Sequence, residues 1–174
     1  MKRQYTPRQM EAYLKSMTVV VDSREQVWPH IEKGLETMGY PCERGKLDIG
    51  DYTCKLPDLD GAPVIFSDEV VIERKACLDE IASNFTVGRR RFENEFLRAK
   101  AAGVKVFLLI ENAGWTDVLT GNYRSGIKPN AFAAALLSWQ AKYNLTIVFC
   151  RREDSARMIA GTLYYWLRAN LEGG

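Results

Sequence analysis

The chain has 174 residues, of which 47% are hydrophobic and 26% are charged, and its formal net charge is +2. These proportions are those of a globular domain, and no apolar run approaches the ~20 residues that cross a bilayer, so we expect a cytoplasmic protein without a membrane partner. So small a net charge excludes attraction to nucleic acid by overall charge, and any DNA affinity must come from local clusters of basic residues.

The first segment predicts a short amphipathic helix. Thr6 and Gln9 have the spacing of a capping box, and Pro7 suits the first helical position. An apolar stripe follows at helical spacing, formed by Met10, Tyr13, Leu14 and Met17. We therefore expect residues 1–17 to form a helix appended to a single main domain over residues 18–174.

Strand and helix patterns alternate through the remainder of the chain. Continuous or β-branched apolar runs predict strands at 18–22, 42–47, 51–56, 69–75, 104–110 and 145–149. Helices are expected at 27–38, 77–84, 89–102, 129–143 and 153–171, with a turn at 57–61 and a loop at 113–128. This alternation predicts a three-layer α/β/α domain with a mostly parallel central sheet.

The segment from Val71 to Asp79 carries the clearest chemical signal. Side chains alternate along a strand, so Glu73 and Lys75 share one face while Arg74 points to the other. An acid can hold a hard divalent cation, and a lysine can orient the attacking water or balance charge in the transition state. The pattern therefore favours phosphodiester hydrolysis.

A divalent cation needs more than one carboxylate, and three further acids lie at strand ends. Asp51, after Gly50, begins the strand before the turn; Asp22 ends the first strand. Glu111 ends the strand at 104–110 in the same manner and is a weaker candidate. Sites in α/β sheets gather at the carboxyl ends of strands, so we expect these acids to meet at one edge.

Three of the candidate features have a structural alternative. Asp22 and Asp79 each precede a helix and could serve as its N-cap. The cluster Arg89, Arg90 and Arg91, followed by further basic residues, could contact DNA phosphates or could be a solvated helix face.

Taken together, these motifs resemble the XPF/Hef nuclease family, a variant of the PD-(D/E)XK nuclease core. The resemblance rests on Val-Asp-Ser-Arg-Glu at 21–25, Gly50-Asp51, Glu73-Arg74-Lys75 and Asp79 in matching order and spacing. It continues through Gly88-Arg89, the strand at 106–111 and Ser138-Trp139-Gln140. It covers about residues 18 to 151, most of the chain.

The resemblance implies a restriction-endonuclease-like core that binds Mg²⁺ or Mn²⁺ and needs no organic cofactor. Asp51 and Glu73 would be metal ligands with the carbonyl of Arg74, and Asp22 is a further candidate ligand. Lys75 would be the catalytic lysine. The family positions needed for cleavage also include those of Asp22, Arg74 and Asp79. Arg24, at another such position, is expected to contact DNA with Arg89, Arg90 and Arg91.

The family cuts branched DNA or junctions of single and double strands, in DNA repair and recombination. Members usually carry a helix-hairpin-helix module, and this chain has no room for one, so we expect a stand-alone bacterial or phage-encoded form. Two alternatives stay open. The first is a catalytically silent DNA-binding or partner subunit; such subunits lack the motif acids, whereas this chain has them. The second is a sequence-specific restriction enzyme with the same core.

The helices near the C-terminus predict a homodimer. Helix 153–171 has an apolar stripe sufficient to cover a sheet, but Met158, Tyr164 and Tyr165 lie off that stripe, and helix 129–143 has a similar excess. Domains of the XPF/Hef family pair through this region. The alternative is that the N-terminal helix covers the second face within one chain.

Overall fold

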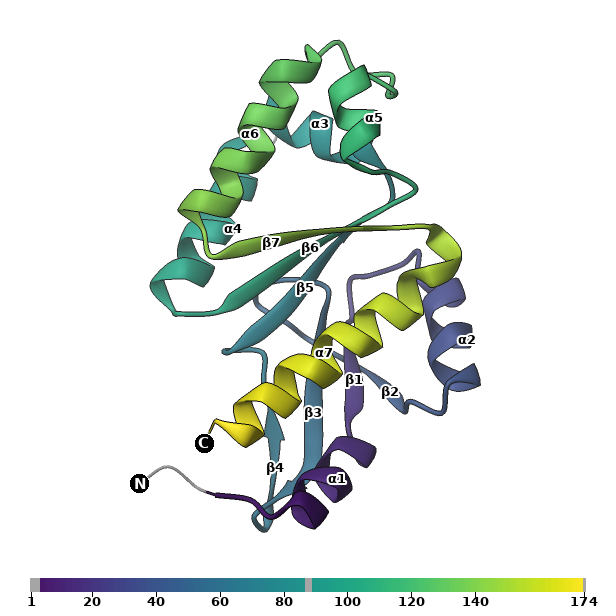
Figure 1. Cartoon of the computed structure of the whole chain (residues 1–174), viewed down its shortest axis with the longest axis vertical. Helices are drawn as coiled ribbons and strands as arrows, with labels where there is room; N and C mark the ends of the chain where they lie inside the picture. The colour runs from purple at the N-terminus through teal and green to yellow at the C-terminus, as the bar shows by residue number, and fades with distance from the viewer. Residues whose placement is uncertain (1–3, 87–88, 174) are drawn as a thin grey trace.

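The computed structural model describes residues 4–86 and 89–173, and within them seven strands form one mixed sheet (Figure 1). The strand order is β2 (Cys42–Gly45), β1 (Thr18–Asp22), β3 (Tyr52–Leu59), β5 (Val70–Lys75), β6 (Lys105–Glu111) and β7 (Leu145–Cys150), with β4 (Ala62–Ile65) paired to β3. β3 runs antiparallel to β1, β4 and β5, whereas β1–β2, β5–β6 and β6–β7 are parallel pairs. The predicted α/β fold is confirmed, and the predicted parallel pairing holds across β5, β6 and β7 and for β1 with β2, whereas β3 is antiparallel to its neighbours.

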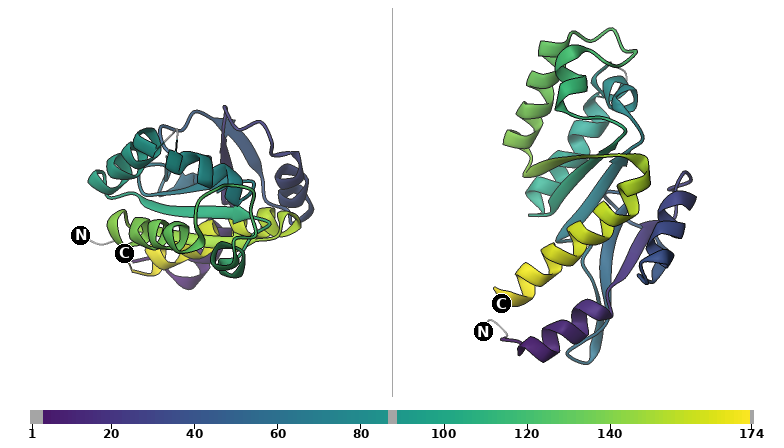
Figure 2. Two further views of the ribbon diagram at one scale, coloured as in Figure 1. Left: turned by 90° about the horizontal axis from the view of Figure 1, so that it is seen from above. Right: turned by 45° about the vertical axis from the view of Figure 1, so that its right-hand side comes forward.

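Helices cover both faces of this sheet, as the predicted three-layer architecture requires. One layer contains α1 (Pro7–Lys15), α2 (Pro29–Thr37) and α7 (Ser155–Glu172), and α7 crosses β1 and β3 diagonally in Figure 1. The other layer contains α3 (Leu78–Thr86), α4 (Arg89–Ala101) and α6 (Pro129–Lys142), with α5 (Trp115–Thr120) beside α6. The two further views in Figure 2 show α4 and α7 on opposite sides of the sheet. No helix of the described residues is long and apolar enough to cross a membrane.

Alternation along each central strand explains why the sheet has two hydrophobic cores. On β5, Ile72 faces the core under α7, and Val71 faces the core under α4. On β6, Leu109 faces the core under α7, and Leu108 faces the core under α4. Successive side chains of β5 therefore point to opposite faces of the sheet. This alternation decides on which face each of the residues after Ile72 lies.

Three segments differ from the sequence-based expectations. β3 continues to Leu59 through the expected turn, and it forms a hairpin with β4, which was not predicted. Pro57 is tolerated there because the β3–β4 register shifts between Leu56 and Leu59, so no regular ladder bond is lost. α5 lies inside the expected loop at 113–128, and a 3₁₀ turn over Arg152–Asp154 precedes α7.

The N-terminal helix forms as predicted, since the Thr6 and Gln9 side chains make the reciprocal capping box. Leu14 and Met17 are buried in the core that also contains the inner face of α7. Most of the apolar excess of α6 is covered within the chain, since Trp139 stacks on Phe85 of α3 at a centroid distance of 4.1 Å, but Leu137 is 54% exposed. The dimer expectation therefore keeps little support from α6 and depends mainly on α7, where Tyr165 is 66% exposed.

Candidate active site

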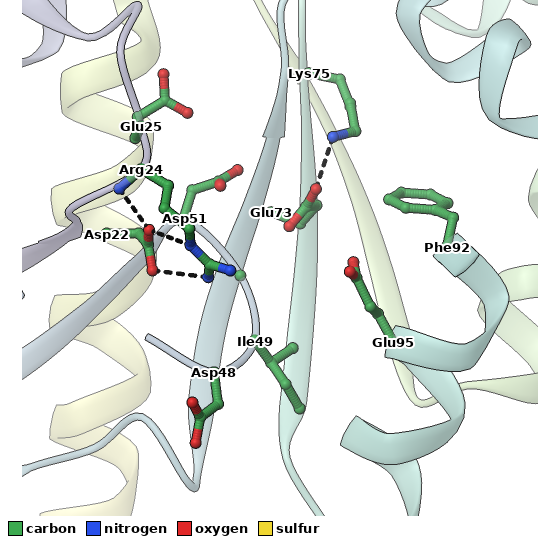
Figure 3. Close-up of a pocket in the computed structure, with 11 residues that line it drawn as sticks. Asp22, Arg24, Glu25, Asp48, Ile49, Asp51, Glu73, Lys75, Phe92 and Glu95 are labelled. Atoms are coloured by element: carbon green, nitrogen blue, oxygen red, sulfur yellow. Dashed lines mark hydrogen bonds and ion pairs between the residues drawn. The ribbon is translucent and has the colours of Figure 1, made fainter. Parts of the chain in front are cut away.

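A pocket of about 390 Å³ opens at the edge of the sheet where β1 and β5 end and β3 begins (Figure 3). β3 is antiparallel to both neighbours, so its first residues lie beside their last residues. The pocket thus collects side chains that are distant in sequence. It is lined by six carboxylates, two basic side chains and three other residues: Asp22, Glu25, Asp48, Asp51, Glu73, Glu95, Arg24, Lys75, Ile49, Gly50 and Phe92.

Asp51 is positioned by the backbone between β1 and β5. Its N–H donates to the carbonyl of Ile72, and its own carbonyl accepts from the N–H of Asp22, both at 2.8 Å. Gly50 makes this placement possible, since its φ is +74° and an added Cβ would lie 2.8 Å from Cβ of Val71. The glycine of the Gly-Asp motif therefore has a steric role.

Glu73 and Lys75 lie on the same face of β5, as predicted, and Lys75 Nζ is 2.6 Å from Glu73 Oε1. Their side chains are 13% and 12% exposed, so the pair is largely shielded from solvent. The ammonium group of Lys75 also lies 5.2 Å from the ring centroid of Phe92, a cation–π contact that holds it over the pocket.

The electrostatics of the pocket favour a bound cation. Burial and the nearby charge of Glu73 raise the pKa of Asp51 well above its usual value. Burial also raises the pKa of Glu73, although Lys75 opposes the shift. Burial alone would lower the pKa of Lys75, but its interactions with Glu73 outweigh this and raise the pKa, so the lysine stays charged. A divalent cation would stabilise the ionised form of both acids.

The donor set fits a hard divalent ion. Arg74 N donates to Oδ2 of Asp51, and Lys75 donates to Oε1 of Glu73, leaving one oxygen of each carboxylate for a metal. Among the described residues, no cluster of three or more acidic, histidine or cysteine side chains is arranged to hold a metal. Magnesium commonly uses one or two carboxylates and several waters, so two acids and a main-chain carbonyl are sufficient.

Asp22 lies in the pocket wall, but its carboxylate is already engaged. It is 1% exposed and accepts hydrogen bonds from the backbone and guanidinium of Arg24 and from the N–H of Leu47. These donors lower its pKa although burial opposes the shift. Asp22 does not cap α2, which begins after Trp28. In this arrangement Asp22 fixes Arg24, whose side chain is 66% exposed at the pocket rim.

Arg74 and Glu111 lie on the opposite face of the sheet from Glu73. The Arg74 guanidinium makes two 2.7 Å bonds to Glu111, whose carboxylate also accepts from Ser155 of α7 at 2.6 Å and contacts His30 of α2 at 3.0 Å. Burial acts to raise the pKa of Glu111, but these bonds outweigh it and lower the pKa to about 2. Glu111, the weaker candidate, is therefore a buried ion-pair partner outside the pocket.

Asp79 and the arginine cluster also lie outside the pocket lining. Asp79 accepts hydrogen bonds from the backbone of Arg124 and Ser125, so its side chain holds a distant loop and does not cap α3. The cluster forms the first turn of α4, and Arg90 is exposed there. The side chains of Arg89 and Arg91 lie outside the described part of the structure.

Sequence reasoning missed several pocket residues. Phe92 and Glu95 are three positions apart on α4, so they share the face that looks toward Glu73 in Figure 3. This spacing could have identified them once the helix was predicted. Glu25 is part of the quoted motif at 21–25, whereas Asp48 is brought in only by the loop before β3.

The fold and the pocket define a class of protein: an α/β nuclease domain with acids and a lysine at the ends of adjacent strands. The chain belongs to the ERCC4 domain family, whose model matches residues 21–162. This family comprises nuclease domains that act on DNA, so the predicted resemblance to XPF-type nucleases is confirmed. No curated protein matches the chain.

Solved structures show the same fold. XPF from Aeropyrum pernix is 22% identical, with a TM-score of 0.64, and the match covers 87% of this chain and 65% of that one. XPF from Aeropyrum pernix in complex with DNA gives 21% identity, a TM-score of 0.61, and coverage of 86% and 64%. The chain thus spans about 65% of the length of the XPF chain.

Proposed function

We propose that the protein is a DNA endonuclease that hydrolyses phosphodiester bonds with Mg²⁺ or Mn²⁺ bound in the pocket. The observation that carries this proposal is the convergence of Asp51, Glu73 and Lys75 at one edge of the sheet, with the lysine 2.6 Å from Glu73. A buried acid pair with one lysine matches the charge requirements of metal-assisted hydrolysis.

Each residue then has a distinct role. Asp51 and Glu73 would hold the metal together with the main-chain carbonyl of Arg74, and the ion, when bound, would supply Lewis-acid activation of the phosphate and of water. Lys75 orients the attacking water and balances the negative charge that develops on the phosphate oxygens. Arg24, held in place by Asp22, contacts a phosphate at the rim of the pocket.

The proposed substrate is branched DNA or a junction of single and double strands, which places the protein in repair or recombination. The solved XPF of Aeropyrum pernix in complex with DNA supports DNA as the ligand class.

A panel of DNA structures tests this proposal. Purified protein would be incubated with Mg²⁺ and end-labelled flap, fork, splayed-arm, four-way junction and plain duplex DNAs, and the cuts mapped on sequencing gels. We expect incision within a few nucleotides of the branch point and none in the duplex control. Equal cutting of the plain duplex would contradict the proposed preference for junctions. Binding without incision would identify a silent DNA-binding subunit.

We also propose that the protein forms a homodimer through α7. An apolar groove of about 490 Å³ lies on the outer side of this helix, lined by Phe107, Arg157, Met158, Gly161, Thr162, Tyr165 and Trp166. Tyr165 is 66% exposed beside it. α1 covers another flank of α7, where Tyr164 packs against the core, so within the described residues the exposed Tyr165 side offers the surface for a second copy.

A further inference from the structure

The loop between α5 and α6, residues 121–128, is fixed to the first turn of α3 by Asp79. Asp79 Oδ1 accepts from the N–H groups of Arg124 at 2.8 Å and Ser125 at 2.9 Å, and its Oδ2 lies 3.3 Å from Arg124 Nε. Asp79 stands in the first turn of α3, directly after the strand that carries Lys75. The acid thus ties a distant loop to the end of the catalytic strand.

The connection to Lys75 is short. Glu80, the neighbour of Asp79, accepts from the N–H of Ala76 at 2.8 Å and lies 3.6 Å from Lys75 Nζ. Figure 1 places α3 and the segment between α5 and α6 together at the end of the molecule to which β5 points. The loop therefore lies on the α3 side, next to the residues that follow Lys75 and outside the pocket lining, whereas Arg24 is part of that lining.

Internal contacts hold the loop in one conformation. Tyr123 packs edge-on against Phe132 at 5.1 Å, and its hydroxyl donates to the carbonyl of Ile127 at 2.9 Å. Asn122 bonds Asp117 through its backbone and its side chain. A loop ordered in this way loses little further conformational entropy when it binds a ligand.

Exposure alternates along the loop. Tyr123, Ser125 and Ile127 are half-buried and anchor it, whereas the outward positions are exposed: Asn122, Arg124, Gly126 and Lys128. The loop contains two basic residues and no acidic residue. Arg124 is 91% exposed and uses Nε for Asp79; among the described residues, no hydrogen bond or ion pair engages its terminal nitrogens. This outward face presents positive charge and hydrogen-bond donors.

The negative charge of the pocket explains why DNA binding requires a positively charged surface nearby. Six carboxylates against Arg24 and Lys75 give the pocket lining an excess of negative charge, which repels a polyanion before a metal enters. Affinity for the DNA backbone must therefore come from cations around the pocket. Basic groups that contact phosphates provide most of the sequence-independent affinity for DNA.

We propose that the loop 121–128 is a DNA-backbone contact, in which Arg124 and Lys128 bind phosphates beside the scissile bond and Asp79 acts as the positioning residue for the loop. This inference rests on the proposed nuclease function for the choice of DNA as the ligand. It assigns Asp79 to substrate binding through Arg124, in place of a direct role at the metal or the reacting phosphate.

The test compares DNA binding and cleavage by the full chain and four variants. The probe is a fluorescently labelled splayed-arm DNA, with binding measured in Ca²⁺ over a range of salt concentrations and cleavage measured in Mg²⁺. The variants are Arg124→Ala with Lys128→Ala, Asp79→Ala, the combination of Asp79→Ala with Arg124→Ala, and Arg168→Ala as the control. Arg168 is an exposed, ion-paired arginine near the end of α7, away from the pocket.

We expect the Arg124/Lys128 double variant to bind several-fold more weakly and its log–log salt slope to fall by about 1.8, as the removal of two phosphate-binding cations requires. KM should rise while kcat at saturating DNA stays near that of the wild type. Asp79→Ala should raise KM in the same way, and adding Arg124→Ala to it should cost little more, because the two residues act as one unit. Arg168→Ala should behave as the wild type.

The outcomes separate this inference from the proposed activity. Wild-type protein that binds DNA without cutting it, with binding still weakened by the loop variants, would refute the activity and support the loop assignment. Unchanged affinity and salt slope in the Arg124/Lys128 variant would overturn the loop assignment whether or not the wild type cuts DNA. Loss of kcat at saturating DNA in Asp79→Ala, with KM unchanged, would overturn the positioning role of Asp79.

Discussion

The backbone N–H of Arg74 donates a 2.8 Å hydrogen bond to Asp51 Oδ2, on the pocket side, while its guanidinium is bonded to Glu111 behind the sheet. One residue therefore joins the pocket to the core under α7. The buried Arg74–Glu111 pair fixes the end of β5, and the adjacent residues Glu73 and Lys75 are consequently presented to the pocket in a defined orientation. The arginine of the Glu-Arg-Lys motif has this structural role in addition to any contribution of its carbonyl.

The first prediction concerns the three central residues of the pocket. Asp51→Asn, Glu73→Gln and Lys75→Met should each lower kcat by about 10²–10³-fold, because each removes a preorganised charge from the transition state. DNA affinity measured in Ca²⁺ should change far less. Single-turnover cleavage and fluorescence anisotropy provide the two measurements.

A matched control for these variants is Glu43→Gln. Glu43 is also paired with a lysine, Lys55 at 2.6 Å, but it lies on β2 and does not line the pocket. Its substitution should leave kcat unchanged. A Glu73→Gln protein that cuts at the wild-type rate would show that the pocket acid is not a metal ligand.

The second prediction concerns the metal. Oxygen donors from Asp51 and Glu73 select hard cations, so cleavage should require Mg²⁺ or Mn²⁺, and Ca²⁺ should support binding with little cleavage. The measurement is initial cleavage rate against metal concentration after chelation and dialysis. Full activity in excess chelator would contradict the role of a divalent ion.

The third prediction concerns pH and stability. The pKa of Glu111 is lowered to about 2 in the folded protein, below its unfolded value of 4.5. A group with a lowered folded pKa stabilises the fold above its unfolded pKa, and that contribution is lost as pH falls toward the folded pKa. Glu111 should therefore contribute on the order of 3 kcal/mol at about pH 7, and lose most of it between about pH 4.5 and pH 2.

Urea unfolding of the wild type and Glu111→Gln at several pH values measures this contribution. The glutamine cannot ionise and leaves the buried Arg74 guanidinium with only Glu25, 3.5 Å from its Nη1, as a counter-charge, so the variant should be less stable near neutral pH. The difference in the free energy of unfolding should shrink as the pH approaches 2. A difference independent of pH would assign the effect to packing.

The sequence predicted the placement of the central pocket residues better than the hydrogen bonds that surround them. Glu73, Lys75 and Asp51 could be predicted because strand alternation and a strand-end glycine restrict where these side chains point. The roles of Asp22 and Asp79 could not, because their partners, Leu47 and Arg124, are 25 and 45 residues away and reach them only after folding. Periodicity describes neighbours on one element and contains no information about such long-range hydrogen bonds.

The missed elements have a similar physical origin. α5 spans six residues, too few for a periodic signal, and Gly114 and Gly121 at its ends are equally typical of loops. The extension of β3 past Pro57 depends on pairing with β4, and pairing can override the local turn preference of Pro, Asp and Gly. Long, continuous apolar strands such as β6 were predicted because burial on both faces leaves a strong composition signal.

The fourth prediction concerns the arginine cluster at the start of α4. Replacing Arg89, Arg90 and Arg91 by Ala should weaken binding to every DNA probe by a similar factor and reduce the salt slope by about 0.9 for each phosphate that the cluster neutralises. The measurement is the salt dependence of the dissociation constant in Ca²⁺. The same slope in the triple variant and the wild type would identify the cluster as a solvated helix face.

The fifth prediction concerns the homodimer through α7. Tyr165 is 66% exposed beside a groove formed by Phe107, Met158 and Trp166, and a second copy related by a two-fold axis would bury the same surface on both chains. Tyr165→Glu should convert a dimer to a monomer, because it places an unpaired charge in the contact. Leu119→Glu, which changes an exposed leucine on α5, is the matched control and should remain dimeric. Light scattering coupled to size exclusion measures both masses. A monomeric wild type at high protein concentration would contradict the dimer, whereas a dimer unaffected by Tyr165→Glu would place the contact elsewhere on the surface.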